Sequence, residues 1–208
     1  MALNQQTLQQ RTASQDHGVE LVRQHLDALA VAARMAQSAA PVVHEWGQQL
    51  AAVFAAGGKL LACGNGGSAA EAQHLTGELL GRFREERRPL PAVALCADSA
   101  AVTAIANDYG TEELFARQVR AYGRRGDVLV ALSTSGSSPN VIAAAKAGLE
   151  LGLTVWALTG PAPNPLAALS DSAIAVDAPT VATVQEIHLN LVHSLCIALD
   201  HALRTGEL

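Results

Sequence analysis

A glycine-rich loop followed by a histidine and a glutamate is the part of the sequence best suited to chemistry. The apolar run at residues 60–63 leads into Gly-Asn-Gly-Gly-Ser at 64–68, and a segment without proline then carries His74 and Glu78. This order predicts a strand, a tight loop and a helix. The glycines let backbone amides and a helix N-terminus approach an anion. Because His74 and Glu78 are four residues apart, they share a helix face. By themselves they could be a plain surface pair, but beside this loop we interpret them as part of a site.

A second polar cluster has the sequence Ser-Thr-Ser-Gly-Ser-Ser at residues 133–138. It follows the apolar run 129–132 and precedes Pro139 and a helical pattern at 140–151. Hydroxyls and free amides around one helix N-terminus can hold a phosphate without lysine, because oriented N–H dipoles and hydroxyl donors meet its oxygens. An ordinary capping turn needs one or two hydroxyls rather than five. We therefore interpret the cluster as a phosphate cradle.

Composition limits the classes of function. The chain has 208 residues, a formal net charge of -5 and 50% hydrophobic residues, and it contains no Lys/Arg run. Nonspecific binding to nucleic acid or to a membrane surface relies on dense positive charge, so small molecules are the expected partners. Cys63, Cys96 and Cys196 are odd in number and lie in apolar surroundings, which favours buried reduced thiols. With no signal peptide pattern and no apolar stretch of about 18 residues, we expect a cytoplasmic protein.

The elements that must position these residues follow from the hydrophobic pattern. Short apolar runs alternate with helical patterns after two N-terminal helices, which predicts an α/β fold with a parallel sheet covered on both faces. Ligands bind outside the C-terminal strand ends of such sheets, where both polar loops fall.

We expect one domain at 17–208 after a polar lead-in at 1–16. The expected strands are 60–63, 91–96, 127–132, 153–159 and 173–176, and the expected helices are 19–35, 41–56, 69–82, 100–106, 112–122, 140–151, a short one near 166, and 182–204.

Several motifs in this order resemble one known family. The chain is similar to the sedoheptulose 7-phosphate isomerases, or phosphoheptose isomerases, of the sugar isomerase (SIS) superfamily, from about residue 19 to the C-terminus. The resemblance implies a SIS-type three-layer fold with five parallel strands, N-terminal helices used in oligomerisation, a homotetramer, Zn²⁺, and conversion of sedoheptulose 7-phosphate to D-glycero-D-manno-heptose 7-phosphate. The motifs are Gly64-Asn65-Gly66-Gly67-Ser68, His74-x-x-x-Glu78, Gly81-Arg82, Asn107-Asp108-Tyr109-Gly110, Ser133-Thr134-Ser135-Gly136 and Gln185-Glu186-Ile187-His188, with His193 beyond.

The resemblance also implies roles for single residues. The zinc positions of the family fall on His74, Glu78, Gln185 and His193. Its phosphate loop falls on Ser133, Thr134, Ser135 and Ser138. The expected further substrate contacts are Asn65, Gly66, Gly67, Ser68, Arg82, Asn107, Asp108 and Gln185.

The chemistry can also be built from the residue types. Interconverting a ketose and an aldose moves a proton between C1 and C2 through an enediol, which needs one group at carbon and another at oxygen. We assign Glu78 as the base at carbon and His193 as the acid/base at oxygen. Zinc accepts imidazole nitrogen and carboxylate oxygen, but Glu78 cannot easily be a tight ligand and a free base at once.

Other functions stay open at this point. A noncatalytic SIS protein could bind a sugar phosphate or the bacterial replication initiator, and an enzyme of the same fold could act on another ketose phosphate. The initiator-binding proteins carry asparagine where this chain has His193, which favours catalysis here. Thr183 departs from the arginine of many relatives and removes a charge near the site. His188 is interpreted as structural, and Asp98 either caps the next helix or contacts the sugar.

Helix geometry raises the question of shared active sites. Gln185 and His193 are eight residues apart, or ~12 Å along a continuous helix. Either the helix begins after Gln185, or different subunits supply the two groups to one ion. We expect active sites shared between subunits, since symmetric oligomers commonly place sites at their contacts.

Overall fold

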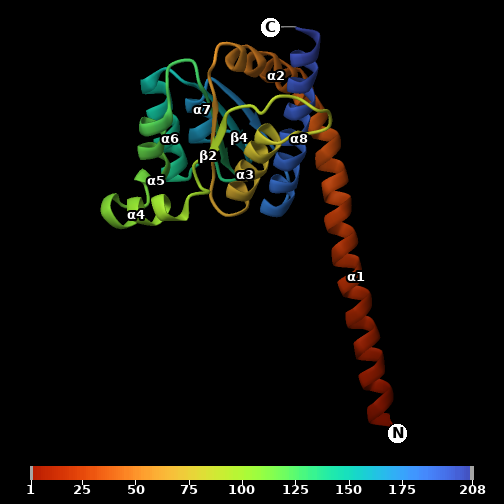
Figure 1. Ribbon diagram of the computed structural model, residues 1–208. Coiled ribbons are helices and arrows are strands. Elements are labelled where there is room, and N and C mark those ends of the chain that lie inside the picture. Colours follow the sequence, from red (N-terminus) through yellow and green to blue (C-terminus); the bar gives the residue numbers. More distant parts are fainter. Residues whose placement is uncertain (1, 207–208) are drawn as a thin grey trace.

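The computed structural model describes the backbone of residues 2–206 and the side chains of residues 17–206. Figure 1 shows a body built around a sheet, with one long helix projecting from it. The sheet contains five parallel strands in the order β2-β1-β3-β4-β5. The predicted five-stranded parallel α/β fold is therefore confirmed. The strands are β1 (Leu60–Cys63), β2 (Ala92–Ala94), β3 (Val128–Ser133), β4 (Thr154–Thr159) and β5 (Ser172–Ala175).

The helices match their predicted positions closely except the first, which begins at Ala2 rather than near residue 19 because the polar lead-in continues the same helix. The expected break between the first two helices is a single 3-10 turn, η1 (Gln37–Ala39), and a proline lies in the first turn of the second helix. The helices are α1 (Ala2–Ala36), α2 (Ala40–Ala55), α3 (Gly67–Leu80), α4 (Ser99–Tyr109), α5 (Glu113–Tyr122), α6 (Pro139–Leu151), α7 (Pro165–Leu169) and α8 (Val181–Thr205). No helix among residues 2–206 has the length and apolar character needed to cross a membrane.

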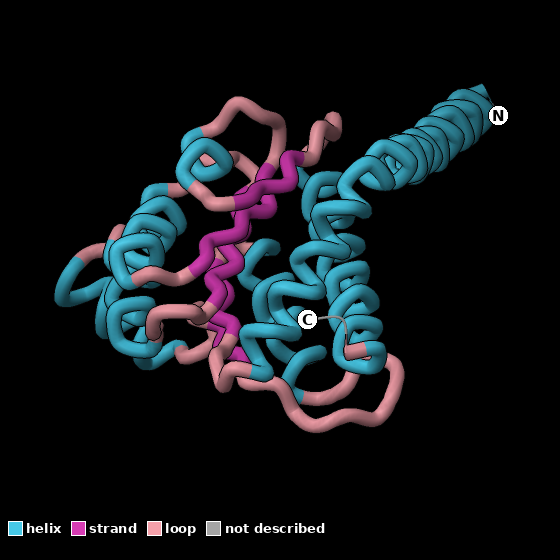
Figure 2. The backbone as a smooth tube through the Cα atoms, turned by 90° about the horizontal axis from the view of Figure 1, so that it is seen from above, coloured by secondary structure: helices cyan, strands magenta, loops and turns pink. Residues whose placement is uncertain are grey.

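Two helical layers enclose the sheet, as Figure 2 shows from above. Alternate strand residues point to opposite faces, so Leu60 joins a core with α2, α3 and α8, whereas Leu61 joins a core with α5 and α6. In the first core Trp46 stacks on Trp156, with ring centroids 4.8 Å apart. These strands are apolar almost throughout because both faces of the sheet are buried.

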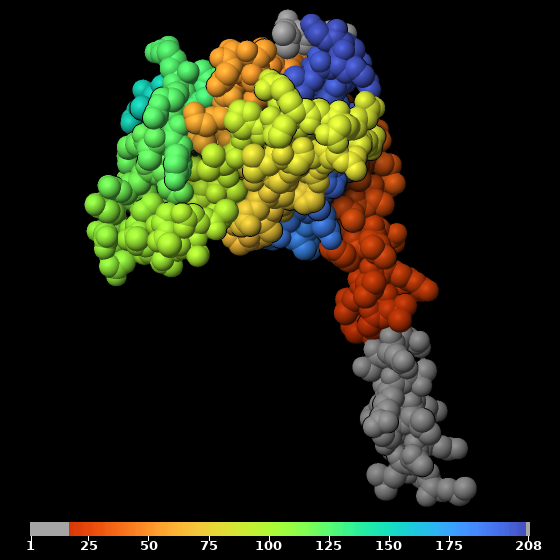
Figure 3. Space-filling view, viewed as in Figure 1, coloured from red at the N-terminus to blue at the C-terminus, as the bar shows by residue number. Residues whose placement is uncertain are grey.

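The long helix α1 contacts the body only near its C-terminal end. His25 lies 2.9 Å from a carboxylate oxygen of Glu186 on α8, a pairing that the sequence pattern did not predict. The described part of α1 before His25 stands clear of the body (Figure 3). Val22 and Leu26, on either side of His25 in sequence, are 60% and 57% exposed. An apolar helix face of this kind is a candidate contact surface.

The packing of α3 against α8 positions the candidate site. Arg87, just beyond α3, donates to the carbonyls of Glu78 and Leu79 at the end of that helix. Its Nε donates to Asp200 on α8 at 2.9 Å, and both side chains are largely buried. One guanidinium therefore satisfies free C-terminal carbonyls of α3 and joins α3 to α8.

We expect Arg87→Ala to lower the free energy of unfolding by about 2 kcal/mol, because hydrogen bonds from a charged group to mostly buried acceptors are lost. Arg204→Ala is the matched control, since its ion pair with Glu85 is 60% and 69% exposed and should contribute less than about 1 kcal/mol. Urea unfolding followed by circular dichroism at one protein concentration measures both. Equal losses in the two variants would contradict the bridging role of Arg87.

Candidate functional site

Two histidines and a glutamate form a cluster where α3 meets α8. The Nε2 atom of His74 lies 3.2 Å from Glu78 Oε1 and 2.8 Å from Nε2 of His193. One ligand atom of each residue lies within 4.8 Å of the others. Two imidazole nitrogens this close need a proton or a cation between them, because two lone pairs would repel each other. The three side chains therefore fit a metal ion of the zinc type, which prefers nitrogen and carboxylate oxygen.

All three side chains come from one chain. His74 and His193 are 119 residues apart in sequence, and only the packing of α3 on α8 brings them together. The side chains of His74 and Glu78 are 42% and 22% exposed, so a ligand can reach the cluster from solvent. A second subunit is not needed to complete this group of three. Sharing between subunits was predicted for Gln185 and His193, and it stays a prediction.

The groups behind the cluster are apolar or neutral. The ring of Phe83 lies 5.5 Å from the ring of His193. Burial, followed by the charges of Glu78 and Asp200, raises the pKa of Cys196 to about 12. That thiol therefore stays protonated at neutral pH. Cys63, Cys96 and Cys196 are all free, as the sequence predicted.

The side chain of Gln185 lies against Gly67, at the start of α3. A Cβ atom on Gly67 would lie 2.5 Å from Nε2 of Gln185, so only glycine allows this contact. Helix α8 begins at Val181, and the alternative in which the helix starts after Gln185 is therefore wrong. Gln185 meets the first turn of α3, and His193 meets the same helix further along. The two helices run in the same direction.

A buried histidine and glutamate lie between these two contacts. His188 is 0% exposed, and its Nε2 donates to the carbonyl of Thr159 at the end of β4. Its Nδ1 faces Glu71 Oε2 at 3.7 Å, and neither of these atoms has a hydrogen-bond partner. His188 thus anchors α8 to the sheet and to α3, in agreement with the structural role expected for it.

The serine-rich loop gathers its hydroxyls at the start of α6. Ser133 Oγ lies 3.0 Å from Ser138 Oγ and 3.3 Å from Ser135 Oγ. Ser138 is the N-cap residue of α6, yet its side chain makes no capping hydrogen bond. Gly136 has φ +60°, and a Cβ there would collide with Asn164. Hydroxyls and amides at this helix N-terminus are thereby arranged as an anion site requires.

The two polar loops meet at the point where the strand order reverses. Strands β1 and β3 are neighbours, and β2 lies on the other side of β1, so the loops after β1 and β3 flank the crevice in which such folds bind ligands. Asn65 in the first loop and Asn140 in the first turn of α6 exchange two hydrogen bonds of 2.9 and 2.8 Å. Sequence reasoning missed Asn140, because one asparagine after a proline carries no recognisable signal.

The other predicted substrate contacts differ in their exposure and in their hydrogen-bond partners. Ser68 is 3% exposed and Thr134 is half-buried. Arg82 is exposed and donates to the carbonyl of Arg84. Asn107 donates to Asp108 at the exposed end of α4, so these two side chains contact each other.

Asp98 and Thr183, whose roles the sequence left open, both make hydrogen bonds at the N-terminus of a helix. Asp98 accepts from the amides of Ala100 and Ala101 and therefore caps α4. Thr183 is fully buried, and both its amide and its hydroxyl contact Thr180 Oγ1 at the start of α8. A short side chain at position 183 thus belongs to the cap of α8.

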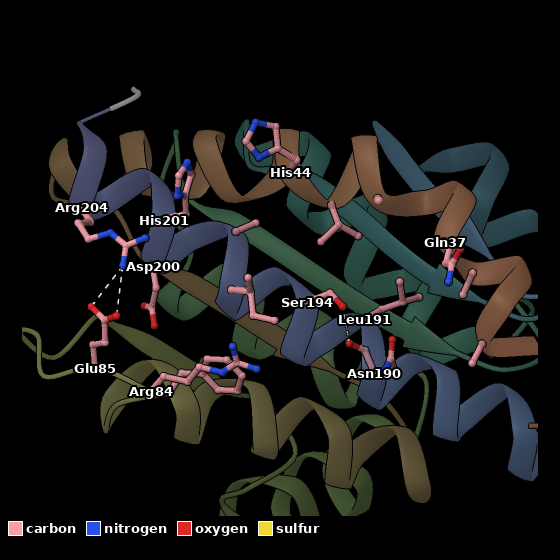
Figure 4. A pocket seen from close by; sticks show the side chains of 17 residues that line it. Gln37, His44, Arg84, Glu85, Asn190, Leu191, Ser194, Asp200, His201 and Arg204 are labelled. Carbon is pink, nitrogen blue, oxygen red and sulfur yellow. Dashed lines mark hydrogen bonds and ion pairs between the residues drawn. The ribbon is translucent and has the colours of Figure 1, made fainter. Parts of the chain in front are cut away.

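A pocket of about 620 Å³ lies beside the cluster without including it. Figure 4 shows its walls, formed by α1, α2, α8 and the segment after α3. Phe83 lines the pocket and also contacts His193. The walls are mainly apolar, with Ile197 45% exposed, which suits protein packing better than a sugar phosphate.

Comparisons with known proteins agree with this geometry. The SIS domain family matches residues 26–160. Phosphoheptose isomerase of Streptomyces coelicolor is 60% identical over 88% of this chain and 79% of its own length. Phosphoheptose isomerase of Nitratidesulfovibrio vulgaris is 46% identical over 90% of this chain and 91% of its own length.

Two solved structures have the same fold. A phosphoheptose isomerase from Francisella tularensis superposes with a TM-score of 0.84 at 35% identity, covering 88% of this chain and 98% of that one. The phosphoheptose isomerase of Neisseria gonorrhoeae gives a TM-score of 0.81 at 42% identity, with the same coverage of 88% and 98%.

The geometry predicts how metal binding responds to mutation. We expect His74→Ala and His193→Ala each to weaken Zn²⁺ binding by at least about 10- to 100-fold, the loss that even an outer-shell partner causes. Competition with a chromophoric chelator measures the affinity. His17→Ala, an exposed histidine on α1, is the control and should bind as the parent chain does. Mixing the two cluster variants should restore no tight site, and recovery on mixing would show that the histidines come from different chains.

Proposed function

The chain belongs to the SIS domain family and, within it, to the phosphoheptose isomerases, and from this premise we propose how its residues carry out the reaction. The enzyme is an aldose–ketose isomerase that converts sedoheptulose 7-phosphate to D-glycero-D-manno-heptose 7-phosphate. The observation that carries the residue assignment is the cluster of His74, Glu78 and His193 beside a glycine-rich loop. It offers a carboxylate and an imidazole within reach of one ligand.

Glu78 is the base at carbon in this proposal. Its carboxylate removes a proton from C1 of the ketose, the C2 carbonyl oxygen gains a proton, and an enediol forms. The same carboxylic acid then returns a proton to C2, while the O1 hydroxyl loses its proton and C1 becomes the aldehyde. C1 is oxidised and C2 is reduced within one molecule, so no external oxidant or reductant takes part. The partly exposed position of Glu78 supports this role.

His193 serves the two oxygens. An imidazole can donate a proton to O2 and accept one from O1 because its ordinary pKa lies near neutrality. The contacts of His74 with both His193 and Glu78 support this division of roles, because one substrate could reach both groups. His74 holds the orientation of both neighbours through its contacts to them.

Zn²⁺ is the proposed cofactor. His74, Glu78 and His193 would hold the ion, and Gln185 would join them if its side chain turned from Gly67. Each would bind through one of its donor atoms, which leaves the second carboxylate oxygen of Glu78 and the second ring nitrogen of His193 for proton transfer. A bound zinc ion supplies a positive charge that stabilises the enediolate oxygens. The chemistry of the donor set supports this choice, because it combines two imidazoles with one carboxylate.

The serine-rich loop would bind the phosphate. Ser133, Ser135 and Ser138 converge at the start of α6, and Thr134 contributes from the same loop. The amides of Gly66 and Gly67 and the side chains of Asn65 and Ser68 would contact the sugar from the neighbouring loop. Arg82, Asn107 and Asp108 are proposed as further contacts that approach the substrate from exposed positions.

We also propose a homotetramer assembled through the N-terminal helices. The exposed apolar residues of α1, among them Val22 and Leu26, are poorly suited to solvent. The C-terminal end of α1 also lines the apolar pocket between α1, α2 and α8, through Ala33 and Ala36. Active sites shared between subunits are part of this proposal, with a neighbouring subunit supplying substrate contacts rather than a histidine of the cluster. The closeness of Phe83 to both pocket and His193 would let such an interface influence the site.

Glu78→Gln should nearly abolish turnover while preserving the fold, because glutamine keeps the shape and removes the base. We expect less than about a tenth of the parental kcat, a change of at least ~1.4 kcal/mol in the barrier. NMR detection of the aldoheptose phosphate measures turnover, and circular dichroism checks folding. Glu85→Gln, at an exposed position, is the control and should keep full activity. A Glu78→Gln enzyme with more than that fraction of turnover would show that another group is the base.

Ser135→Ala combined with Ser138→Ala should chiefly raise KM, because the hydroxyls bind the phosphate equally before and during the reaction. We expect KM to rise at least about tenfold, with kcat changed by less than about threefold. Steady-state kinetics with sedoheptulose 7-phosphate measures both constants. An unchanged KM would rule out these serines as the phosphate site.

A further inference from the structure

The reciprocal hydrogen bonds between Asn65 and Asn140 join the two halves of the substrate crevice. Asn65 Nδ2 donates to Asn140 Oδ1 at 2.9 Å, and Asn140 Nδ2 donates to Asn65 Oδ1 at 2.8 Å. Asn140 is 9% exposed, whereas Asn65 is exposed. The pair thus has an inner member within the protein and an outer member at the surface of the crevice.

The location of the pair suggests what it does. Asn65 follows β1, and Asn140 lies in the first turn of α6 after β3. These strands are adjacent, with Cys63 opposite Ala131. The first loop leads into α3, which carries His74 and Glu78, and the second presents the serine hydroxyls. The amide pair is a direct side-chain link between the loop before the metal cluster and the helix behind the phosphate cradle.

The pair also fixes which groups Asn65 can offer to a ligand. A carboxamide has two N–H donors and two acceptor lone pairs. Asn140 uses one donor and one lone pair of Asn65, so one N–H and one lone pair remain at the exposed edge. The last torsion of an isolated asparagine is broad, and rotation would exchange donor and acceptor. The second amide prevents that exchange, because rotation of Asn65 alone would oppose N–H to N–H and oxygen to oxygen.

We propose that Asn140 is a positioning residue for the isomerisation: it holds the Asn65 carboxamide in one orientation toward the sugar and keeps the glycine-rich loop in register with the phosphate helix. Asn140 acts through Asn65 and does not touch the substrate itself. The proposal rests on the proposed function, in which Asn65 contacts the sugar. It adds a residue that lies outside the recognised motifs.

A double-mutant cycle tests the proposal on the full-length enzyme. If Asn140 acts through Asn65, then Asn65→Ala and Asn140→Ala should each lower kcat/KM by about tenfold, and the double variant should lose little more than either single variant. Asn140→Asp should also lose activity although its size is unchanged, because a carboxylate cannot donate to Asn65 Oδ1. Since the serine hydroxyls remain, the loss in Asn140→Ala should fall mainly on kcat, with KM changed by less than about threefold.

Gln118→Ala is the matched structural control. Gln118 is a buried amide that donates two hydrogen bonds, to the carbonyls of Leu95 and Leu114, and it has no contact with Asn65. Any effect of Gln118→Ala on kcat/KM should multiply with that of Asn65→Ala, as effects of independent sites do. Thermal unfolding of every variant separates loss of folded protein from loss of activity.

The outcomes separate this inference from the function on which it rests. Multiplicative losses for Asn65→Ala and Asn140→Ala, or full activity in Asn140→Asp, would overturn the positioning role while leaving the isomerase intact. An unchanged kcat/KM in Asn65→Ala would remove Asn65 from the sugar site and overturn the inference with it. A parent enzyme that does not isomerise sedoheptulose 7-phosphate would instead contradict the proposed function itself.

Discussion

The contact between α3 and α8 holds the reactive side chains in place. Three successive pairs lie along it, namely Gly67 with Gln185, Glu71 with His188, and His74 with His193. The first pair is close because position 67 is glycine, since a Cβ there would displace the carboxamide of Gln185. Arg87 and Asp200 join the two helices beyond the last pair. Catalytic groups must be held to within fractions of an ångström. A helix–helix contact made at several positions along its length provides that precision.

The sheet also fixes the distance between the two parts of the site that are proposed to hold the two ends of the substrate. A heptose 7-phosphate carries its phosphate at one end and its reacting C1 and C2 atoms at the other. The phosphate cradle follows β3, and the helix with Glu78 follows β1. Because the two strands are hydrogen-bonded neighbours, the backbone sets this distance before any substrate binds. The Asn65–Asn140 pair then refines the arrangement at the level of side chains.

The fold could be predicted from the sequence almost completely, because buried parallel strands are continuous apolar runs and the helices between them have clear periodicity. The polar loops were recognisable because glycine and serine gather at strand ends. Contacts between distant elements could not be predicted from local patterns. Three of these contacts depend on how α8 packs. They join His74 to His193, Glu186 to His25, and Gln185 to Gly67. The start of α8 before Gln185 was also open, since the cap formed by Thr180 and Thr183 is not distinctive.

The central claim is that Glu78 moves a proton between C1 and C2 in a site open to solvent. Isomerisation of sedoheptulose 7-phosphate in D₂O, followed by mass spectrometry and NMR of the aldoheptose phosphate, tests it most directly. A carboxylic acid that is 22% exposed exchanges its proton with water, so the account predicts deuterium at C2 of the product. A product that forms in D₂O without deuterium at C2 would show that the transferred proton does not exchange with water and would contradict the account of a proton-transfer site open to solvent.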